Sequence, residues 1–493
     1  MNILKRISLV LIVLLSGFIF GCKNKENVDY KIETLTIYTV NDFHGSLEEE
    51  DGAKGAARMA SYIKDGLAEF GDAALVVSAG DMFQGSALSN YNYGRTVIDV
   101  MNYTSFSSMT IGNHEFDWKL ETVLNYRDGN TENGEANFPF LGCNIINKNT
   151  GSIPEGIEPY TIVERKNLKI GIIGYIGAGQ EEDILAENVA DYYFDQPIDC
   201  IKNYSYYLRT VENCNVVITV GHDASSSVDK QISNLNGDYR VDGIINGHSH
   251  ATYSDTYRRS DGVVIPCCQA GSAGTHVGVL KLTIDPETNS VTGGSCFVKQ
   301  MSNRISKDST VEGIVNSLKE ETAPMFQRVL CQAGQKIDRI HAADWVADAL
   351  EDYTDADVAF VNYGGIRANA FPIEKGSDVT YSKVYQISPF DNLVVTFKLS
   401  GQFIINMLNV SGINHSYSIS GDSLNGYSIN GVKIDPDATY KVATIDFLFS
   451  NNSYNFHYGT DAVKTNTILR DVIVETLENL SKNGKTWVMN ERN

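Results

Sequence analysis

The sequence is short of positive charge. It contains 40 Lys and Arg residues against 61 Asp and Glu residues, which leaves a formal net charge of −21 at pH 7. A surface that negative repels polyanions, so we exclude a protein that wraps a DNA or RNA polymer. A small phosphorylated ligand is still compatible with this charge, provided that cations within its site reverse the local field.

The cysteine spacing of a structural zinc site is also missing, because no two of the eight cysteines form a CxxC pair. Apart from Cys22, we interpret the cysteines as structural residues, with room for a disulfide or two in an oxidising envelope, and not as metal ligands. They are Cys143, Cys200, Cys214, Cys267, Cys268, Cys296 and Cys331.

Long apolar runs are absent after residue 20. The one notable run, residues 7–20, has 14 residues and follows a Lys-Arg pair, which is typical of a signal peptide and short for a membrane span. It ends in "FGC", and a small residue before Cys resembles a bacterial lipobox. We therefore predict a lipoprotein signal peptide over residues 1–21, lipid on Cys22 and a polar tether over residues 22–33. An ordinary cleaved signal peptide is the alternative.

The first half of the chain alternates short β-rich runs with longer mixed segments and has no internal repeat. This alternation is typical of a layered α/β domain, which a hairpin over residues 278–300 closes. A polar helical segment follows, and the second half combines a helix over residues 339–354 with further β-rich segments, which predicts an α+β domain. The strand candidates of the first half are residues 34–40, 74–79, 106–111, 168–175, 215–220 and 242–247.

Polar side chains follow five of these strands at the point where each strand ends. In open α/β sheets, ligands bind at the carboxyl ends of strands, so residues far apart in the sequence are expected on one rim. Five of the nine histidines lie at these positions, beside glycines that allow a sharp turn or a close backbone approach. The residues concerned are Asp42, His44, Asp81, Asn113, His114, Asp117, His222, His248 and His250.

The kinds of side chain on this rim predict a metal centre. Imidazole, carboxylate and amide groups without a thiolate suit Zn²⁺, Mn²⁺, Fe or Co. The candidate ligands are too many for one tetrahedral ion, and they suit two divalent ions that share a carboxylate. We therefore expect two divalent metal ions as cofactors.

Four motifs, "DFHG", "GDMFQGS", "GNHEFDW" and "GHSH", occur in this order and resemble those of the calcineurin-like metallophosphoesterases. Within that group they look most like the bacterial 5′-nucleotidase and UDP-sugar hydrolase family. The resemblance implies a layered metallophosphoesterase β-sandwich flanked by helices over residues 34–303. It further implies a linker helix over residues 304–328 and an α+β 5′-nucleotidase C-terminal, substrate-binding domain over residues 329–493. The implied activity is metal-dependent hydrolysis of phosphoric esters.

The resemblance also implies roles for the rim residues. His114 would be the catalytic imidazole and Asp117 the carboxylate that orients it, whereas Glu115 would be solvated or structural. Asp81 would bridge the two metals. The first metal would be held by Asp42, His44, Asp81 and His250, and the second by Asp81, Asn113, His222 and His248.

Two motifs of the second half, "NYGGIRA" and "SPFDN", resemble elements through which the family contacts its substrate. Arg367 is expected to pair with a phosphate or carboxylate group. Phe390 is expected to stack on a base and Asn392 to bond to the nucleoside. The second stacking aromatic of the family follows a Gly-Gly-Asp-Gly turn, which this chain replaces with "SNNSYNFHYG", so that Tyr454 or Phe456 would supply the ring. Core packing is the alternative for Phe390 and Phe456.

The expected function is that of a lipid-anchored, extracytoplasmic phosphoesterase of the cell envelope that hydrolyses nucleotides to nucleoside and phosphate. One alternative is the same chemistry on UDP-sugars, 2′,3′-cyclic nucleotides or another small phosphoester. Another is a surface-binding lipoprotein without turnover, which the intact set of ligands argues against. The native metal and the oligomeric state are left open by the sequence.

Overall fold

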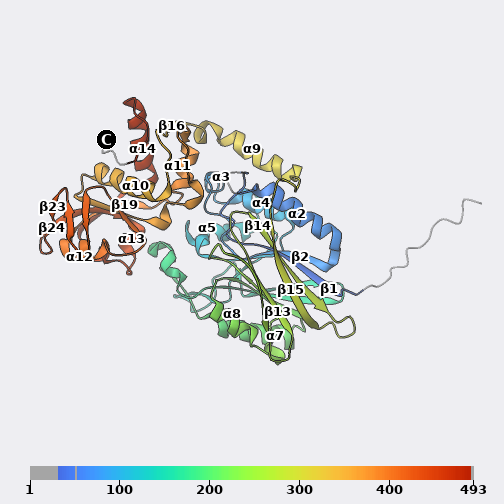
Figure 1. The fold of residues 1–493 in the computed structure, drawn as a ribbon. Helices are drawn as coiled ribbons and strands as arrows, with labels where there is room; N and C mark the ends of the chain where they lie inside the picture. The colour runs from blue at the N-terminus through green and yellow to red at the C-terminus, as the bar shows by residue number, and fades with distance from the viewer. Residues whose placement is uncertain (1–30, 50–52, 490–493) are drawn as a thin grey trace, which may run out of the picture.

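The computed structural model describes residues 31–49 and 53–489. The predicted signal peptide, Cys22 and most of the predicted tether lie outside these residues. Figure 1 shows two lobes, the first formed by the N-terminal half of the chain and the second by the C-terminal part, with the helix α9 running along one side of the first lobe.

The first lobe is built on two β-sheets. The seven-stranded sheet has the order β15-β14-β1-β2-β3-β4-β6, and the six-stranded sheet has the order β12-β13-β11-β10-β8-β7. In each sheet the central strands run parallel, which brings their carboxyl ends to one edge. The first sheet comprises β1 (Thr34–Val40), β2 (Ala74–Ser78), β3 (Ser108–Thr110), β4 (Phe140–Leu141), β6 (Ile157–Glu158), β14 (His276–Ile284) and β15 (Val291–Gln300). The second comprises β7 (Tyr160–Arg165), β8 (Leu168–Ile176), β10 (Val216–His222), β11 (Gly243–Asn246), β12 (Thr252–Arg258) and β13 (Val264–Ala270).

The two sheets pack against each other through an apolar layer to which both contribute, for example Ile37 and Val77 from one and Ile172 and Ile218 from the other. Strands buried on both faces read as continuous apolar runs, which is why these segments are recognisable in the sequence. The outer face of the first sheet is covered by α2 (Gly55–Phe70), α4 (Arg95–Thr104) and α9 (Ser309–Phe326), and that of the second by α7 (Pro197–Thr210) and α8 (Ser226–Ser233). The predicted β-sandwich flanked by helices is confirmed.

The segment predicted as a linker forms the helix α9, which packs onto the first lobe. Asp308 caps it by accepting hydrogen bonds from the backbone N–H groups of Thr310 and Val311. Its side chains Val315 and Phe326 belong to the same core as the helices of the first lobe, whereas the core of the second lobe begins at Leu330. The change from one lobe to the other therefore takes place just after α9.

The second lobe is a five-stranded sheet with helices packed on it, in keeping with the predicted α+β class. Its order is β20-β17-β24-β19-β25. A three-stranded sheet is formed by β21 (Ile419–Asp422), β22 (Gly426–Ile429) and β23 (Val432–Lys433). The helices α10 (Arg339–Thr354) and α14 (Leu469–Lys482) bury their apolar faces in the same core. The main strands are β17 (Val358–Asn362), β19 (Leu393–Ser400), β20 (Ile413–His415), β24 (Thr439–Ile445) and β25 (Thr460–Ile468).

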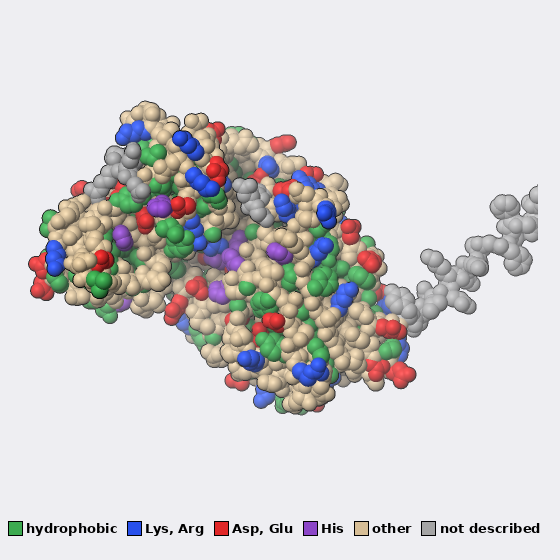
Figure 2. All heavy atoms as spheres, viewed as in Figure 1, with side chains coloured by type: hydrophobic (Ala, Val, Ile, Leu, Met, Phe, Trp, Pro, Cys, Tyr) green, Lys and Arg blue, Asp and Glu red, His purple; other side chains and the backbone are tan. Residues whose placement is uncertain are grey.

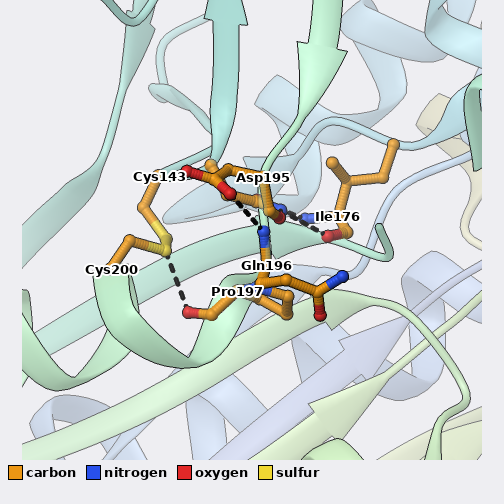
Figure 3. Close-up of a disulfide and its surroundings, with 7 residues drawn as sticks. Cys143, Ile176, Asp195, Gln196, Pro197 and Cys200 are labelled. Carbon is orange, nitrogen blue, oxygen red and sulfur yellow. Dashed lines mark hydrogen bonds between the residues drawn. A yellow bond between two sulfur atoms is a disulfide. The ribbon is translucent and has the colours of Figure 1, made fainter. Parts of the chain in front are cut away.

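One disulfide joins Cys143, which follows β4, to Cys200 in α7. Figure 3 shows it next to the turn from Asp195 to Pro197, whose carbonyl oxygen lies 3.0 Å from the sulfur of Cys200. The sequence allowed for such a bond without giving the pairing. In the described part of the chain, no helix is both long and apolar enough to cross a bilayer.

Candidate metal centre and substrate cavity

The ends of five strands from both sheets of the first lobe meet in one place. The backbone N–H of His248, just after β11, donates to Asp42 Oδ1 at 3.0 Å, although 206 positions separate the two residues. His222, at the end of β10, lies with Nε2 3.0 Å from the Oδ1 of Asn113. Figure 2 shows histidine side chains gathered where the surface is hollowed between the two lobes. All seven predicted metal ligands lie in this cluster.

The first group of predicted ligands is compact. The Nε2 atoms of His44 and His250 are 3.0 Å apart, and Nε2 of His250 is 3.8 Å from Asp42 Oδ1. Ligand atoms of Asp42, His44 and His250 all lie within 4.8 Å of one another, and Nε2 of His44 lies 4.0 Å from Asp81 Oδ2.

The second group shares Asp81 with the first. Nε2 of His222 lies 3.2 Å from Asp81 Oδ2, and Nδ1 of His248 lies 3.1 Å from Asn113 Oδ1. Asp81 therefore stands between the two groups, as the bridging role implied by the resemblance requires.

The electrostatics of the cluster fit divalent cations. Asp42 and Asp81 are 0% and 1% exposed, and buried carboxylates need a positive partner. Burial lowers the pKa of His248 and of His250 to about 4, so both imidazoles are neutral at pH 7 and offer lone pairs. Burial also lowers the pKa of His222, but Asp81 and Asp42 outweigh it and raise that pKa to about 10. Without a metal, the protonated form of His222 supplies the positive charge that balances the buried carboxylates of Asp42 and Asp81.

Backbone carbonyls fix the ring orientation of two of the histidines. Nδ1–H of His222 donates to the carbonyl of Ala79 at 2.8 Å, and Nδ1–H of His44 donates to that of Gln84 at 2.9 Å. This tautomer leaves the Nε2 lone pair of each ring directed into the cluster, which is how metal-binding histidines are oriented in proteins.

Backbone strain is concentrated at the same residues. Five of the predicted ligands have positive φ although none is glycine, and such conformations persist only where the surroundings impose them, often at functional sites. The residues and angles are Asp42 (49°), His44 (50°), Asp81 (54°), His248 (75°) and His250 (58°). Gly112 is needed for a steric reason, because a Cβ atom there would lie 2.3 Å from Asp81 Oδ1.

The predicted catalytic pair is formed in the structure. Nδ1 of His114 lies 2.7 Å from Oδ2 of Asp117, and its Nε2 lies 3.9 Å from Asp81 Oδ2. Burial lowers the pKa of His114, but Asp117 and Asp81 outweigh burial and raise it above its usual value. The arrangement stabilises an imidazolium at the edge of the predicted metal site.

Two residues that hold the site together were underestimated from the sequence. The carboxylate of Glu115, 0% exposed, accepts the backbone N–H groups of Gly112, Asp81 and Met82 at 2.8–2.9 Å, so it is structural and not solvated. The amide of Asn41 donates to Asp42 Oδ2 at 2.6 Å and to the carbonyl of Gly271 at 2.7 Å. The sequence signal that could have identified them was their position inside two of the motifs, "NDFHG" for Asn41 and "GNHEFDW" for Glu115.

A cavity of about 290 Å³ extends from this cluster to the second lobe. Arg367, Phe390 and Asn392, which the sequence predicts to contact substrate, are among the residues that line it. The guanidinium of Arg367 lies 3.4 Å from Nε2 of His44, and the ring of Phe390 stacks on that of His114 with centroids 5.8 Å apart. Side chains from both lobes thus enclose one space.

The structure places neither Tyr454 nor Phe456 among the residues that line this cavity. Phe456 is 0% exposed and packs against Phe360 and Phe397 in the core of the second lobe, and Tyr454 packs on that core beside it. Phe447, in the helix α13 (Asp446–Ser450), lines the cavity instead. Trp118, Asn188 and Asp183 are further lining residues that sequence reasoning missed.

Two family models match the chain. The calcineurin-like phosphoesterase domain matches residues 35–252, and the 5′-nucleotidase C-terminal domain matches residues 321–457. The chain is 26% identical over 496 residues to an apyrase from Tabanus yao, across 84% of this chain and 85% of the relative. It is 25% identical over 455 residues to a snake venom 5′-nucleotidase from Crotalus adamanteus, across 83% of this chain and 74% of the relative.

The fold also matches a solved structure. The 5′-nucleotidase precursor from Thermus thermophilus superimposes with a TM-score of 0.75 and 21% identity, covering 93% of this chain and 98% of that one. This likeness shows the two-lobed architecture.

Proposed function

Since the chain belongs to the two-domain 5′-nucleotidase family of calcineurin-like phosphoesterases, which are metal-dependent hydrolases, we propose that it releases phosphate from nucleoside 5′-monophosphates. The observation that supports this substrate is the shared cavity. Its floor is the candidate metal centre of the first lobe, and its walls include Arg367, Phe390 and Phe447 of the second lobe.

The proposed roles follow from the chemistry of each group. Two divalent metals held by Asp42, His44, Asp81, Asn113, His222, His248 and His250 would neutralise the phosphoryl group and activate water. The imidazolium of His114, oriented by Asp117, stabilises the phosphoryl oxygens or donates a proton to the leaving oxygen. Arg367 adds a fixed positive charge on the same side of the cavity, 3.4 Å from His44.

The proposed nucleoside subsite is the part of the cavity that Phe390 and Phe447 line. The phenyl rings of Phe390 and Phe447 both border it, and aromatic rings bind bases by stacking without selecting one base strongly. Asn392 lies beside Phe390 and offers both a donor and an acceptor to the nucleoside.

We further propose that the protein acts in the cell envelope. Support comes from the sequence of residues 1–22, with its basic pair, its apolar run and Cys22. The domain limits proposed are residues 34–303 for the catalytic domain, 304–328 for the linker helix and 329–493 for the substrate-binding domain. A Cys22→Ala variant is expected to appear in the soluble fraction, whereas the unaltered protein sediments with membranes.

Phosphate release from a panel of substrates tests the proposed activity. The purified protein, loaded with Mn²⁺ or Zn²⁺, is assayed on AMP, UMP, UDP-glucose, 2′,3′-cyclic AMP and p-nitrophenyl phosphate. We expect the highest kcat/KM for the nucleoside monophosphates and no release after chelation. Equal rates on all phosphoesters would contradict a nucleotide site, and no release from any substrate would contradict an enzyme.

A further inference from the structure

The cavity is unusual in its balance of charge. Among the described residues that line it, Arg367 is the only Lys or Arg, whereas four carboxylates face it. Three of these have a partner: Asp81 belongs to the metal centre, Asp117 pairs with His114 at 2.7 Å, and Asp391 pairs with Arg470 at 2.5 Å. The fourth carboxylate is Asp183.

Asp183 stands over the metal centre without a compensating cation. It ends the short 3₁₀ helix η4 (Gln180–Asp183), and its Oδ2 lies 3.7 Å from Nε2 of His248. Histidines bind metals in the neutral form, so as a proposed metal ligand this imidazole supplies no positive charge. In the described parts of the chain, no Lys or Arg forms an ion pair with Asp183. Its side chain is 55% exposed, toward the cavity that it lines.

Contacts on both sides hold η4 in place. The amide of Gln180 donates to the backbone carbonyl of His222 at 2.8 Å, which ties the start of η4 to a strand of the metal centre. From the second lobe, the amide of Asn451 donates to the carbonyl of Glu182 at 3.0 Å and the hydroxyl of Ser453 donates to its carboxylate at 3.2 Å. The backbone that carries Asp183 is therefore held by contacts with both lobes.

We propose that Asp183 is a specificity-determining residue that restricts the site to substrates with a single phosphoryl group. The inference rests on the proposed function and narrows it. The metal centre, His114 and Arg367 match the charge of one phosphoryl group. A second phosphate, placed between the first and the nucleoside, finds no further cation and lies near a carboxylate, so binding is opposed by like-charge repulsion. Nucleoside diphosphates, triphosphates and UDP-sugars are accordingly poor substrates.

The test compares substrates and inhibitors that differ by one phosphate. We would measure kcat/KM for AMP, ADP and ATP, and the inhibition constants of inorganic phosphate and pyrophosphate, for the wild type and for Asp183→Asn. The wild type is expected to prefer AMP to ADP, and phosphate to pyrophosphate, by about tenfold or more, the scale of one charge–charge contact in a partly buried site. Asp183→Asn should raise the ADP-to-AMP ratio of kcat/KM, and the affinity for pyrophosphate relative to phosphate, by roughly fivefold to tenfold. Asp65→Asn, on the exposed face of α2, removes the same charge outside the cavity and should change neither ratio.

Three results would overturn the inference. The first is a wild type that hydrolyses AMP and ADP with equal kcat/KM. The second is an Asp183→Asn variant whose substrate ratio and inhibitor ratio are both unchanged. The third is a loss of metal content and of all activities together in Asp183→Asn, which would make Asp183 a residue that orients His248. If the wild type hydrolyses no nucleotide, the proposed function fails, and the phosphate-to-pyrophosphate ratio still tests the role of Asp183.

Discussion

At the scale of single residues, the chain contains a built-in control for its proposed catalytic histidine. His114 and Asp117 are three positions apart with Nδ1 and Oδ2 at 2.7 Å, and the exposed pair His341 and Asp338 has the same spacing and distance. His114→Ala is expected to lower kcat by about 10²–10⁴-fold, the usual contribution of a general acid or base. Metal content should not change, because His114 is not among the proposed ligands. His341→Ala should leave kcat unaltered, and a similar loss in both variants would contradict the assigned role.

Substitutions of Phe447 and Phe456 are expected to affect different properties, substrate binding for Phe447 and folding stability for Phe456. Phe447→Ala is expected to raise KM for AMP by about 5–150-fold, because stacking on a base contributes about 1–3 kcal/mol. Phe456→Ala should instead lower the free energy of unfolding by about 3–5 kcal/mol, since it leaves a cavity in the core. KM and denaturant unfolding measured on both variants check this division. A larger KM effect for Phe456→Ala would restore the prediction made from the sequence.

At the scale of elements, the sequence predicts strands and their ends better than it predicts which side chains face the cavity. Residues 34–40 and 339–354 match β1 and α10, because a run of β-branched and aromatic residues and a one-sided apolar pattern leave little choice. The segment 441–450 is mostly apolar on both sides of Asp446, yet β24 ends at Ile445 and the helix α13 begins at Asp446. Because the chain changes direction there, the side chain of Phe447 lines the cavity. The apolar pattern of the segment does not predict this position.

Side-chain partners across the fold are the other part that the sequence does not predict. The motif "GNHEFDW" identifies the polar residues, but not that the carboxylate of Glu115 accepts three backbone N–H groups from two loops. The rim itself is predictable, because parallel strands place their carboxyl ends at one edge. The second lobe is less so, since its cavity residues lie on loops whose paths depend on contacts distant in sequence.

One such contact is the set of hydrogen bonds between Arg470 and the loop that carries Phe390. This buried guanidinium at the start of α14 donates to the carbonyls of Ser388 and Phe390 and to the carboxylate of Asp391. Arg470→Met leaves these acceptors without their donor, so we expect a loss of about 1–3 kcal/mol of stability and a higher KM for AMP. Arg470→Lys should restore part of both.

Arg328→Met provides the matched control, because Arg328 pairs with Glu478 on the exposed side of α14 and lies outside the cavity. It should change neither KM nor, beyond a few tenths of a kcal/mol, stability. If Arg470→Met lowers stability and leaves KM unchanged, Arg470 supports the fold without positioning Phe390.

At the scale of the whole molecule, the two lobes contribute different parts of one site. The first supplies the cluster of carboxylates and imidazoles, and the second supplies Arg367, Phe390 and Phe447. The net charge of −21 is therefore compatible with an anionic substrate only because metal ions, His114 and Arg367 make this one region positive. Metal removal is expected to abolish phosphate binding as well as turnover.

The most direct test is the metal content of the purified chain, measured by elemental analysis after dialysis against Mn²⁺ or Zn²⁺ and gel filtration. We expect about two equivalents for the wild type, in line with a centre of two ions that share a carboxylate. We expect the same for His114→Ala and much less than one for Asp81→Ala, whose carboxylate lies between both groups of ligands. A single equivalent in the wild type, or an unchanged content in Asp81→Ala, would contradict this expectation.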